Sequence, residues 1–209
     1  MNYFFNRALI FMLAAASAQT AWAGAWTREK GETYSKISFL SVDADQTFGS
    51  KGNNKLDGPD YEESTVAVYS EYGFSPNWTG IVSFSHKSVE SSTAGARGSE
   101  SGLADAWFLL KRRLLTGPIV LSAQAGVKVP LGYDGDHLPP LGDGQEDYEF
   151  RLLAGRSIGI LSGYANAEVG YRRRSGDISD EVPVVLELGV FPVRRLLVKG
   201  LVEGVSNLG

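Results

Sequence analysis

The chain has 209 residues, a formal net charge of -4 and no cysteine, and 25 of its residues are glycine. The lack of cysteine excludes disulfide scaffolds, thiol nucleophiles and iron–sulfur clusters, and two histidines are too few for a multi-histidine metal site. A mildly acidic chain also lacks the basic surface that nucleic-acid binding requires, so we expect no nucleic-acid partner. The composition favours a glycine-rich all-β protein.

Residues 1–23 have the pattern of a secretory signal peptide. A short basic region precedes an apolar run, and Ala21-Trp22-Ala23 supplies small residues at the -3 and -1 positions, so we expect cleavage before Gly24. The apolar run is too short for a membrane-spanning helix, and no later stretch reaches the roughly 18 apolar residues that such a helix needs. We therefore expect an exported protein with one domain over residues 24–209.

Nine segments of alternating polar and apolar residues follow in the mature chain. They cover residues 33–42, 63–74, 78–88, 102–113, 119–129, 147–157, 165–172, 182–190 and 194–203. In the clearest segment, 119–129, isoleucine, leucine, alanine and valine alternate with serine, glutamine, glycine and lysine. A period of two predicts β-strands with one apolar and one polar face.

The polar face of these segments carries charge in mid-strand, whereas the apolar face carries almost none over about ten residues, the length of a tilted membrane-spanning strand. This pattern favours an antiparallel outer-membrane β-barrel, with lipid outside and a polar lumen, over a soluble sandwich. The candidate lumen-lining residues are Glu71, Asp105, Lys111, Lys128, Arg151, Glu168, Arg172 and Glu187. They either line a conduit and set its selectivity or fill the interior of a small barrel with ion pairs.

The connections alternate between long and short, as in transmembrane barrels. The long ones cover residues 43–62, 89–101 and 130–146, with a moderate one at 174–180, and the short ones cover 75–77, 114–117, 158–162 and 191–193. Aromatic residues at strand ends predict two interfacial girdles, and these are Tyr34, Tyr72, Phe74, Trp78, Tyr148 and Tyr171.

An odd count of nine strands conflicts with the even number of bacterial single-chain barrels. We therefore expect about 10 to 12 strands in the complete barrel, with its C-terminal part missing from this chain. The alternative is a strand that the alternation does not reveal, within residues 24–33 or 43–62.

Three short motifs resemble one family of exported barrels. Residues 102–113 (GLADAWFLLKRR), 127–132 (VKVPLG) and 141–147 (LGDGQED) are similar to conserved stretches of the putative outer-membrane proteins of the MetA pathway of phenol degradation. Ala104 stands where that family usually has glycine, and Arg112 replaces its usual aromatic residue.

The resemblance covers about residues 64–190. It implies a barrel in the outer membrane of a Gram-negative bacterium that passes or binds small, often aromatic or hydrophobic, compounds. Its partners would be outer-membrane lipid, lipopolysaccharide and that solute. The alternative is a closed structural or adhesion-related barrel without transport.

A third, weaker reading is a lipid hydrolase at the barrel rim. His86 and Ser88 lie two residues apart on one strand, so they share a face, and the pair resembles the His-x-Ser pair of a lipid A deacylase barrel. We expect instead that the protein is not an enzyme. The acidic stretches within 43–63 and 134–147 offer oxygen ligands for Ca²⁺, but we interpret them as solvated loop surface and predict no metal and no cofactor.

Overall fold

Nine antiparallel strands build the protein in a computed structural model. The model describes residues 24–48, 55–93, 96–133, 138–159, 162–176, 178–193 and 196–208. The strands are β1 (Thr33–Phe48), β2 (Lys55–Ser75), β3 (Trp78–Thr93), β4 (Ala96–Leu115), β5 (Val120–Pro130), β6 (Asp147–Ile158), β7 (Gly163–Arg174), β8 (Asp180–Val193) and β9 (Leu196–Leu208). No helix within these described ranges is long and apolar enough to cross a membrane.

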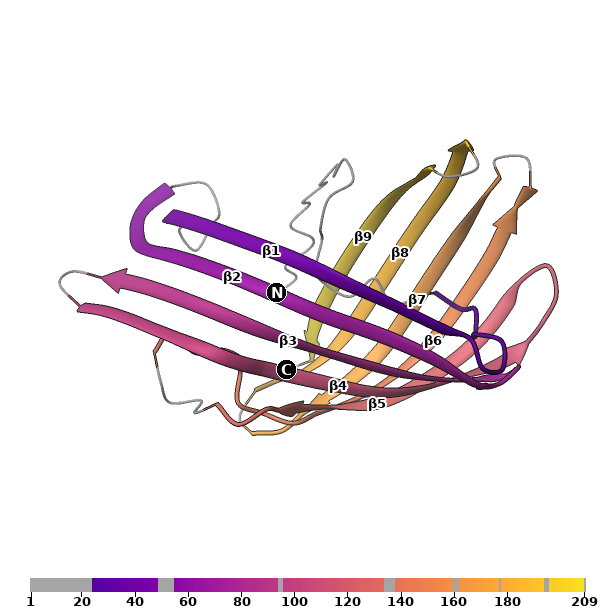
Figure 1. Cartoon of the computed structure of the whole chain (residues 1–209), viewed down its shortest axis with the longest axis horizontal. Helices are drawn as coiled ribbons and strands as arrows, with labels where there is room; N and C mark the ends of the chain where they lie inside the picture. The colour runs from indigo at the N-terminus through magenta and orange to yellow at the C-terminus, as the bar shows by residue number, and fades with distance from the viewer. Residues whose placement is uncertain are drawn as a thin grey trace.

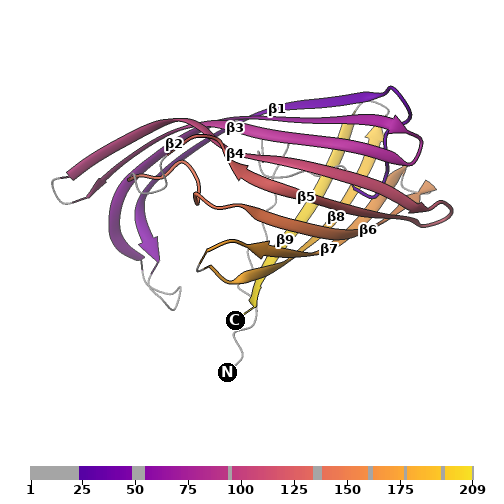
Figure 2. The ribbon, with the colours of Figure 1, turned by 90° about the horizontal axis from the view of Figure 1, so that it is seen from below.

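The strands form one sheet in which each strand pairs with its neighbours in sequence, from β1 to β9. Figures 1 and 2 show this sheet curled into an open half-barrel. Among the described residues, β1 pairs only with β2 and β9 only with β8, so the two outer strands do not pair with each other. The sequence prediction of an all-β fold with nine antiparallel strands is confirmed, and the predicted signal peptide at 1–23 lies outside the described residues.

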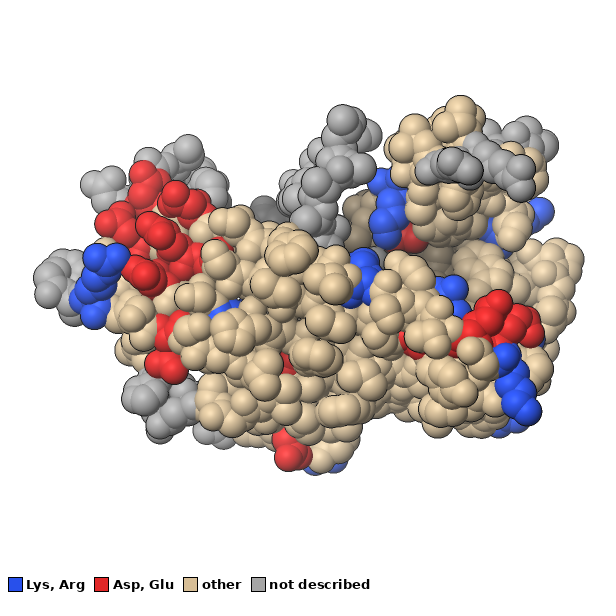
Figure 3. All heavy atoms as spheres, viewed as in Figure 1, with Lys and Arg blue, Asp and Glu red and all other residues tan. Residues whose placement is uncertain are grey.

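Alternation of side chains gives the sheet a convex and a concave face with opposite chemistry. On the convex face, large apolar side chains are exposed, among them Phe39 at 66%, Phe150 at 49% and Leu186 at 54%. In Figure 3 the face over β1–β4 is largely free of charge, and most of the acidic and basic side chains in view lie toward its two ends. The concave face holds the buried charged residues described below, which is the distribution expected from a period of two.

Two predicted loops are mostly strand. β2 has 21 residues and β4 has 20, and the ladder of β3 with β4 continues to the pair Thr93 and Ala96. The prediction of loops at 43–62 and 89–101 is therefore wrong, because backbone pairing persists beyond the segment where one face is apolar. At about 3.3 Å per residue, β2 is close to 70 Å long, well beyond the roughly ten residues that a crossing strand needs.

The half-barrel has two distinct ends. The end with the β2–β3, β4–β5, β6–β7 and β8–β9 connections is called the turn end here, and the opposite end, which carries the β5–β6 loop, is called the loop end. Two small apolar clusters lie on the concave face. One joins Tyr69, Ile81 and Leu109 with Trp107 packed against them, and the other joins Ala25, Val120 and Leu153 with Trp26.

Candidate functional site

The concave face of the half-barrel holds all eight charged residues predicted from the sequence. Lys111 is fully buried, and Arg151 and Glu71 are each only 1% exposed. Lys128 and Glu168 are also buried, whereas Asp105, Arg172 and Glu187 are partly exposed and form ion pairs there, as do the five buried ones. The structure thus gathers these residues on one surface, while their predicted role in a conduit stays a prediction.

Arg151 is the centre of the charged surface. Its Nε lies 2.5 Å from Glu149 Oε1, and its NH1 lies 3.2 Å from Glu168 Oε2. Glu149 also pairs with Arg172, whose NH2 lies 2.8 Å from Glu149 Oε2. The NH1 of Arg172 lies 2.8 Å from Glu181 Oε2. These contacts neutralise carboxylates that burial would otherwise destabilise.

Contacts also cross the concavity between strands that are not neighbours. The guanidinium of Arg172 on β7 lies over the ring of Trp107 on β4, 5.2 Å from its centroid. Near the turn end, Lys111 on β4 lies 3.7 Å from Glu71 on β2. The curled sheet therefore has an interior that long side chains span.

Lys128 organises the loop end. Its Nζ lies 2.5 Å from Asp143, 2.9 Å from Asp147 and 3.6 Å from Asp105. Arg174 also contacts Asp143, so this loop carboxylate bridges two cations. Burial raises the pKa of Asp143, but the hydrogen bonds and charge of Lys128 outweigh it, with help from Arg174, and hold that pKa below its ordinary value.

The β5–β6 loop folds toward the concave face as a consequence. Besides Asp143, the loop residue Tyr133 donates a hydrogen bond to Asp105 at 2.6 Å. Leu141 is 2% exposed and lies against the position that a Cβ on Gly102 would take, at 3.1 Å. Asp143 and Asp147 are thus paired with cations of the protein, which the prediction of solvated loop surface did not include, although Asp143 is also exposed. Glu146 is exposed, as that prediction expects. Asp134 and Asp136 lie outside the described residues.

One continuous polar network connects the two ends of the half-barrel. From the loop end to the turn end it runs through Lys128, Asp143, Arg174, Glu181, Arg172, Glu149, Arg151, Glu168, Asn166 and the backbone of Ala25. Six of these ten residues were not predicted as lumen-lining residues, and they are Asp143, Arg174, Glu181, Glu149, Asn166 and Ala25.

The segment Gly24–Arg28 occupies the turn end of the concave face, a position that the alternation of polar and apolar residues does not predict. The carbonyl of Gly24 accepts a hydrogen bond from Lys111 Nζ at 3.1 Å, and Ser122 donates to the carbonyl of Ala25. The backbone N–H of Ala25 donates to Asn166 Oδ1 at 3.0 Å. Gly24 and Ala25 are buried as a result.

Glycines on the neighbouring strands give this segment its space. A Cβ on Gly155 would lie 2.7 Å from the ring of Trp26, and one on Gly73 would lie 2.0 Å from the carbonyl oxygen of Glu29. Inward-facing glycines at these two positions were therefore the available sequence signal for a segment that packs against the sheet.

His86 and Ser88 lie exposed on the convex face, as the alternation predicts. In the described part of the chain, neither side chain makes a hydrogen bond. No acidic group there orients the imidazole, so the geometry gives little support to a nucleophile–base pair. The prediction that Tyr34 belongs to an interfacial girdle is wrong. Tyr34 lies on the concave face, where the centroid of its ring is 6.4 Å from that of Tyr69.

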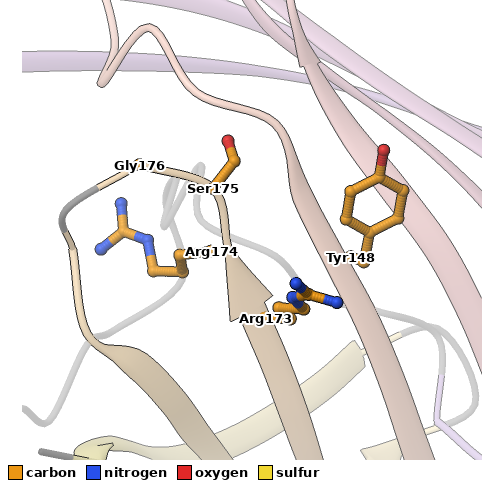
Figure 4. A pocket seen from close by; sticks show the side chains of 5 residues that line it. All are labelled: Tyr148, Arg173, Arg174, Ser175 and Gly176. Atoms are coloured by element: carbon orange, nitrogen blue, oxygen red, sulfur yellow. The ribbon is translucent and has the colours of Figure 1, made fainter.

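An open depression of about 610 Å³ lies at the loop end of β6 and β7, lined by Tyr148, Arg173, Arg174, Ser175 and Gly176. In Figure 4, Arg173 extends toward Tyr148, whereas Arg174 extends away from both. Arg174 belongs to the network of the concave face, and Arg173 is exposed at the rim. The depression thus marks the border between the two faces.

Comparison of the chain with models of known protein families and with curated proteins finds no match. The resemblance to the MetA-pathway barrels therefore stays an expectation that rests on the three motifs.

Proposed function

We propose that the protein forms the wall of an outer-membrane β-barrel in a Gram-negative bacterium and acts as a passive channel or binding protein for small, aromatic or hydrophobic, molecules. The observation that carries the proposal is the inverted distribution of side chains. Charged residues such as Lys111 and Arg151 are buried on the concave face, while large apolar residues are exposed on the convex face. A water-soluble sheet buries its apolar face instead.

The energetics of a bilayer favour this orientation. A charged side chain at the bilayer centre costs about 2.5 to 3.5 kcal/mol, whereas leucine or phenylalanine is stabilised there. In the proposed membrane orientation, the convex face meets lipid and the ion-paired concave face lines the lumen. The outer edges of β1 and β9 then need further strands to close the wall, because unpaired backbone groups are not tolerated in lipid.

The rim residues fit the proposed membrane partners. Tyr148 and Tyr171 are about half exposed on the convex side at the loop ends of β6 and β7, where aromatic side chains would meet the headgroup layer. Arg173 lies beside Tyr148 and would contact anionic groups of lipopolysaccharide there.

The concave face supports a small aromatic solute better than a large polar one. Ion pairs line much of the concave face, so a closed barrel would leave only a narrow path between them. Trp107 and Tyr69 offer aromatic surface inside this path, next to Arg172 and Glu71. An aromatic solute with one polar group can stack on such rings and exchange hydrogen bonds with their charged neighbours.

Insertion tests the membrane orientation. The full chain is refolded into lipid vesicles, and the variants Leu186→Asp on the convex face and Ser83→Asp on the concave face are compared by protease protection. We expect Leu186→Asp to reduce insertion strongly and Ser83→Asp to leave it unchanged. Equal insertion of both variants would contradict the proposed orientation.

Transport and binding are then measured on the inserted protein. We expect vesicle swelling with small sugars and a cut-off for larger ones, and quenching of tryptophan fluorescence by phenol that decreases in Trp107→Phe. If the inserted protein shows neither solute flux nor phenol binding, the channel and binding proposal is rejected and the closed structural barrel is favoured. The continuous ion-pair network makes that closed barrel the second candidate. For the rim hydrolase, an unchanged lipid acylation pattern with Ser88→Ala would exclude it.

A further inference from the structure

The N-terminal segment Gly24–Arg28 is held on the concave face as a ligand is held. Three different strands supply side chains to its backbone: Lys111 from β4, Ser122 from β5 and Asn166 from β7. A coil that merely crosses a surface would not have two consecutive residues buried with their backbone groups bonded to three strands.

The side chains of the segment are bound as well. The ring of Trp26 lies 5.9 Å from that of Tyr164 in an edge-to-face arrangement. Arg28 forms an ion pair with Glu71, its backbone N–H donates to Thr79 at 2.8 Å, and its guanidinium lies 4.7 Å from the centre of the Tyr34 ring. Recognition thus combines a backbone cradle, an aromatic contact and a charged contact.

The site also contains a polar group that the segment leaves unused. Gln124 is 1% exposed and follows Ser122 on the same face of β5, and neither its amide nitrogen nor its carbonyl oxygen has a hydrogen-bond partner in the described structure. Cleavage before Gly24 would give that residue an α-ammonium, which donates up to three hydrogen bonds. The carbonyl of Gln124 is a free acceptor on the strand position next to the one that binds Ala25.

We propose that Gly24–Arg28 is an internal peptide plug, bound in a site for a free N-terminal Gly-Ala-Trp peptide, and that it closes the turn end of the lumen. The binding site stands on the contacts of this segment alone, whereas closure of the lumen rests on the proposed channel function. The plug narrows the path where Lys111 and Glu71 already approach each other, so its removal opens that end.

The first experiment tests the binding site in trans. The chain lacking residues 24–28 is refolded in detergent, and its affinity for the synthetic peptide Gly-Ala-Trp-Thr-Arg with a C-terminal fluorophore is measured by fluorescence anisotropy. We expect saturable binding that falls about tenfold or more when the peptide carries Trp26→Ala or when the chain carries Asn166→Ala. If the deletion variant is folded and does not bind the peptide, the proposal is overturned.

A second experiment uses the full chain, in case the deletion variant does not fold. The protein has no cysteine, so Ala25→Cys with Ser122→Cys introduces a single thiol pair where side chain and backbone touch. We expect oxidation to convert this variant to a faster-migrating form on a denaturing gel. The control, Ala25→Cys with Ser91→Cys at the loop end, should not change. Cross-linking of both pairs, or of neither, overturns the placement of the plug.

Conductance separates the plug from the channel. In planar bilayers we expect the deletion variant to conduct at least several-fold more than the intact chain, and the added peptide to restore the lower value. Peptide binding without conductance in either protein supports the site and rejects the channel function. Conductance that is equal with and without the segment rejects closure of the lumen by the plug.

Discussion

Different kinds of contact cover the two ends of the concave face. At the turn end, the backbone carbonyls of Gly24 and Ala25 and the ring of Trp26 fill the space between strands. At the loop end, Lys128 holds three carboxylates, one of them on a loop that bends inward. The turn end depends mainly on shape and backbone groups, with an added ion pair between Arg28 and Glu71, whereas the loop end depends on charge.

This difference has a physical consequence for stability. Backbone hydrogen bonds and buried aromatic surface are insensitive to pH, and they fail when volume is added or removed. An ion-pair cluster fails when one of its groups changes protonation state or is removed. The turn end should therefore respond to steric substitutions and the loop end to charge.

Arg151 connects the two ends, so its removal should have the largest effect. Arg151→Leu leaves Glu149 and Glu168 without their central partner, although both are almost fully buried. Because removing one partner of a buried ion pair leaves the other charge buried and unpaired, we expect the free energy of unfolding in detergent to fall by about 3 to 5 kcal/mol. The matched control is Arg156→Leu, an exposed arginine on the same strand, which should change stability by less than about 0.5 kcal/mol. Similar losses in the two variants would show that the network does not hold the fold.

Gly155 gives a steric test of the turn end. Gly155→Val introduces a Cβ 2.7 Å from the Trp26 ring and 3.1 Å from the Cβ of Ala25, so the segment must shift. We expect a loss of about 1 to 3 kcal/mol in unfolding free energy and a red shift of tryptophan emission, with no change in pH dependence. Gly117→Val, at a position with open space around it, serves as the control. Retention of the emission maximum in Gly155→Val would argue against the packing of Trp26 on this strand.

Much of the fold follows from the sequence because alternation is a local property. Leu121 and Val127 point away from the concave face and Lys128 points into it, as the period of two requires. The ends of β2 and β4 could not be predicted in the same way. Their polar residues look like loops when no face is apolar, although the backbone ladder does not depend on side-chain polarity.

The site could be predicted only in part for a related reason. Mid-strand charge on the polar face identifies Arg151 and Glu168 directly, because the apolar face of the same strands carries no charge at those positions. Asn166 and the segment Gly24–Arg28 carry no such signal, because their role depends on which strands face each other across the curl. Contacts between distant segments are set by tertiary structure and leave little trace in local spacing.

Acid provides the test of the loop end, with the smallest and most local effect. Because the pKa of Asp143 is lowered in the folded protein, its ion pairs stabilise the inward loop at pH values above the ordinary carboxyl pKa of about 3.9. That stabilisation is lost as the pH falls through the lowered pKa. Asp105 and Asp147 also face Lys128, at 3.6 Å and 2.9 Å.

The release of this loop can be followed with a single fluorophore. Leu138 in the loop is 81% exposed, and Leu138→Cys gives the chain its one thiol for labelling. We expect the label to be immobile from pH 7 to about pH 4 and to become mobile below that, with the turn end unaffected. In Asp143→Asn the same label should already be mobile at pH 7, because Lys128 and Arg174 lose the carboxylate that joins them. An identical acid transition in both proteins would assign the release to other carboxylates and remove Asp143 from the closure of the loop end.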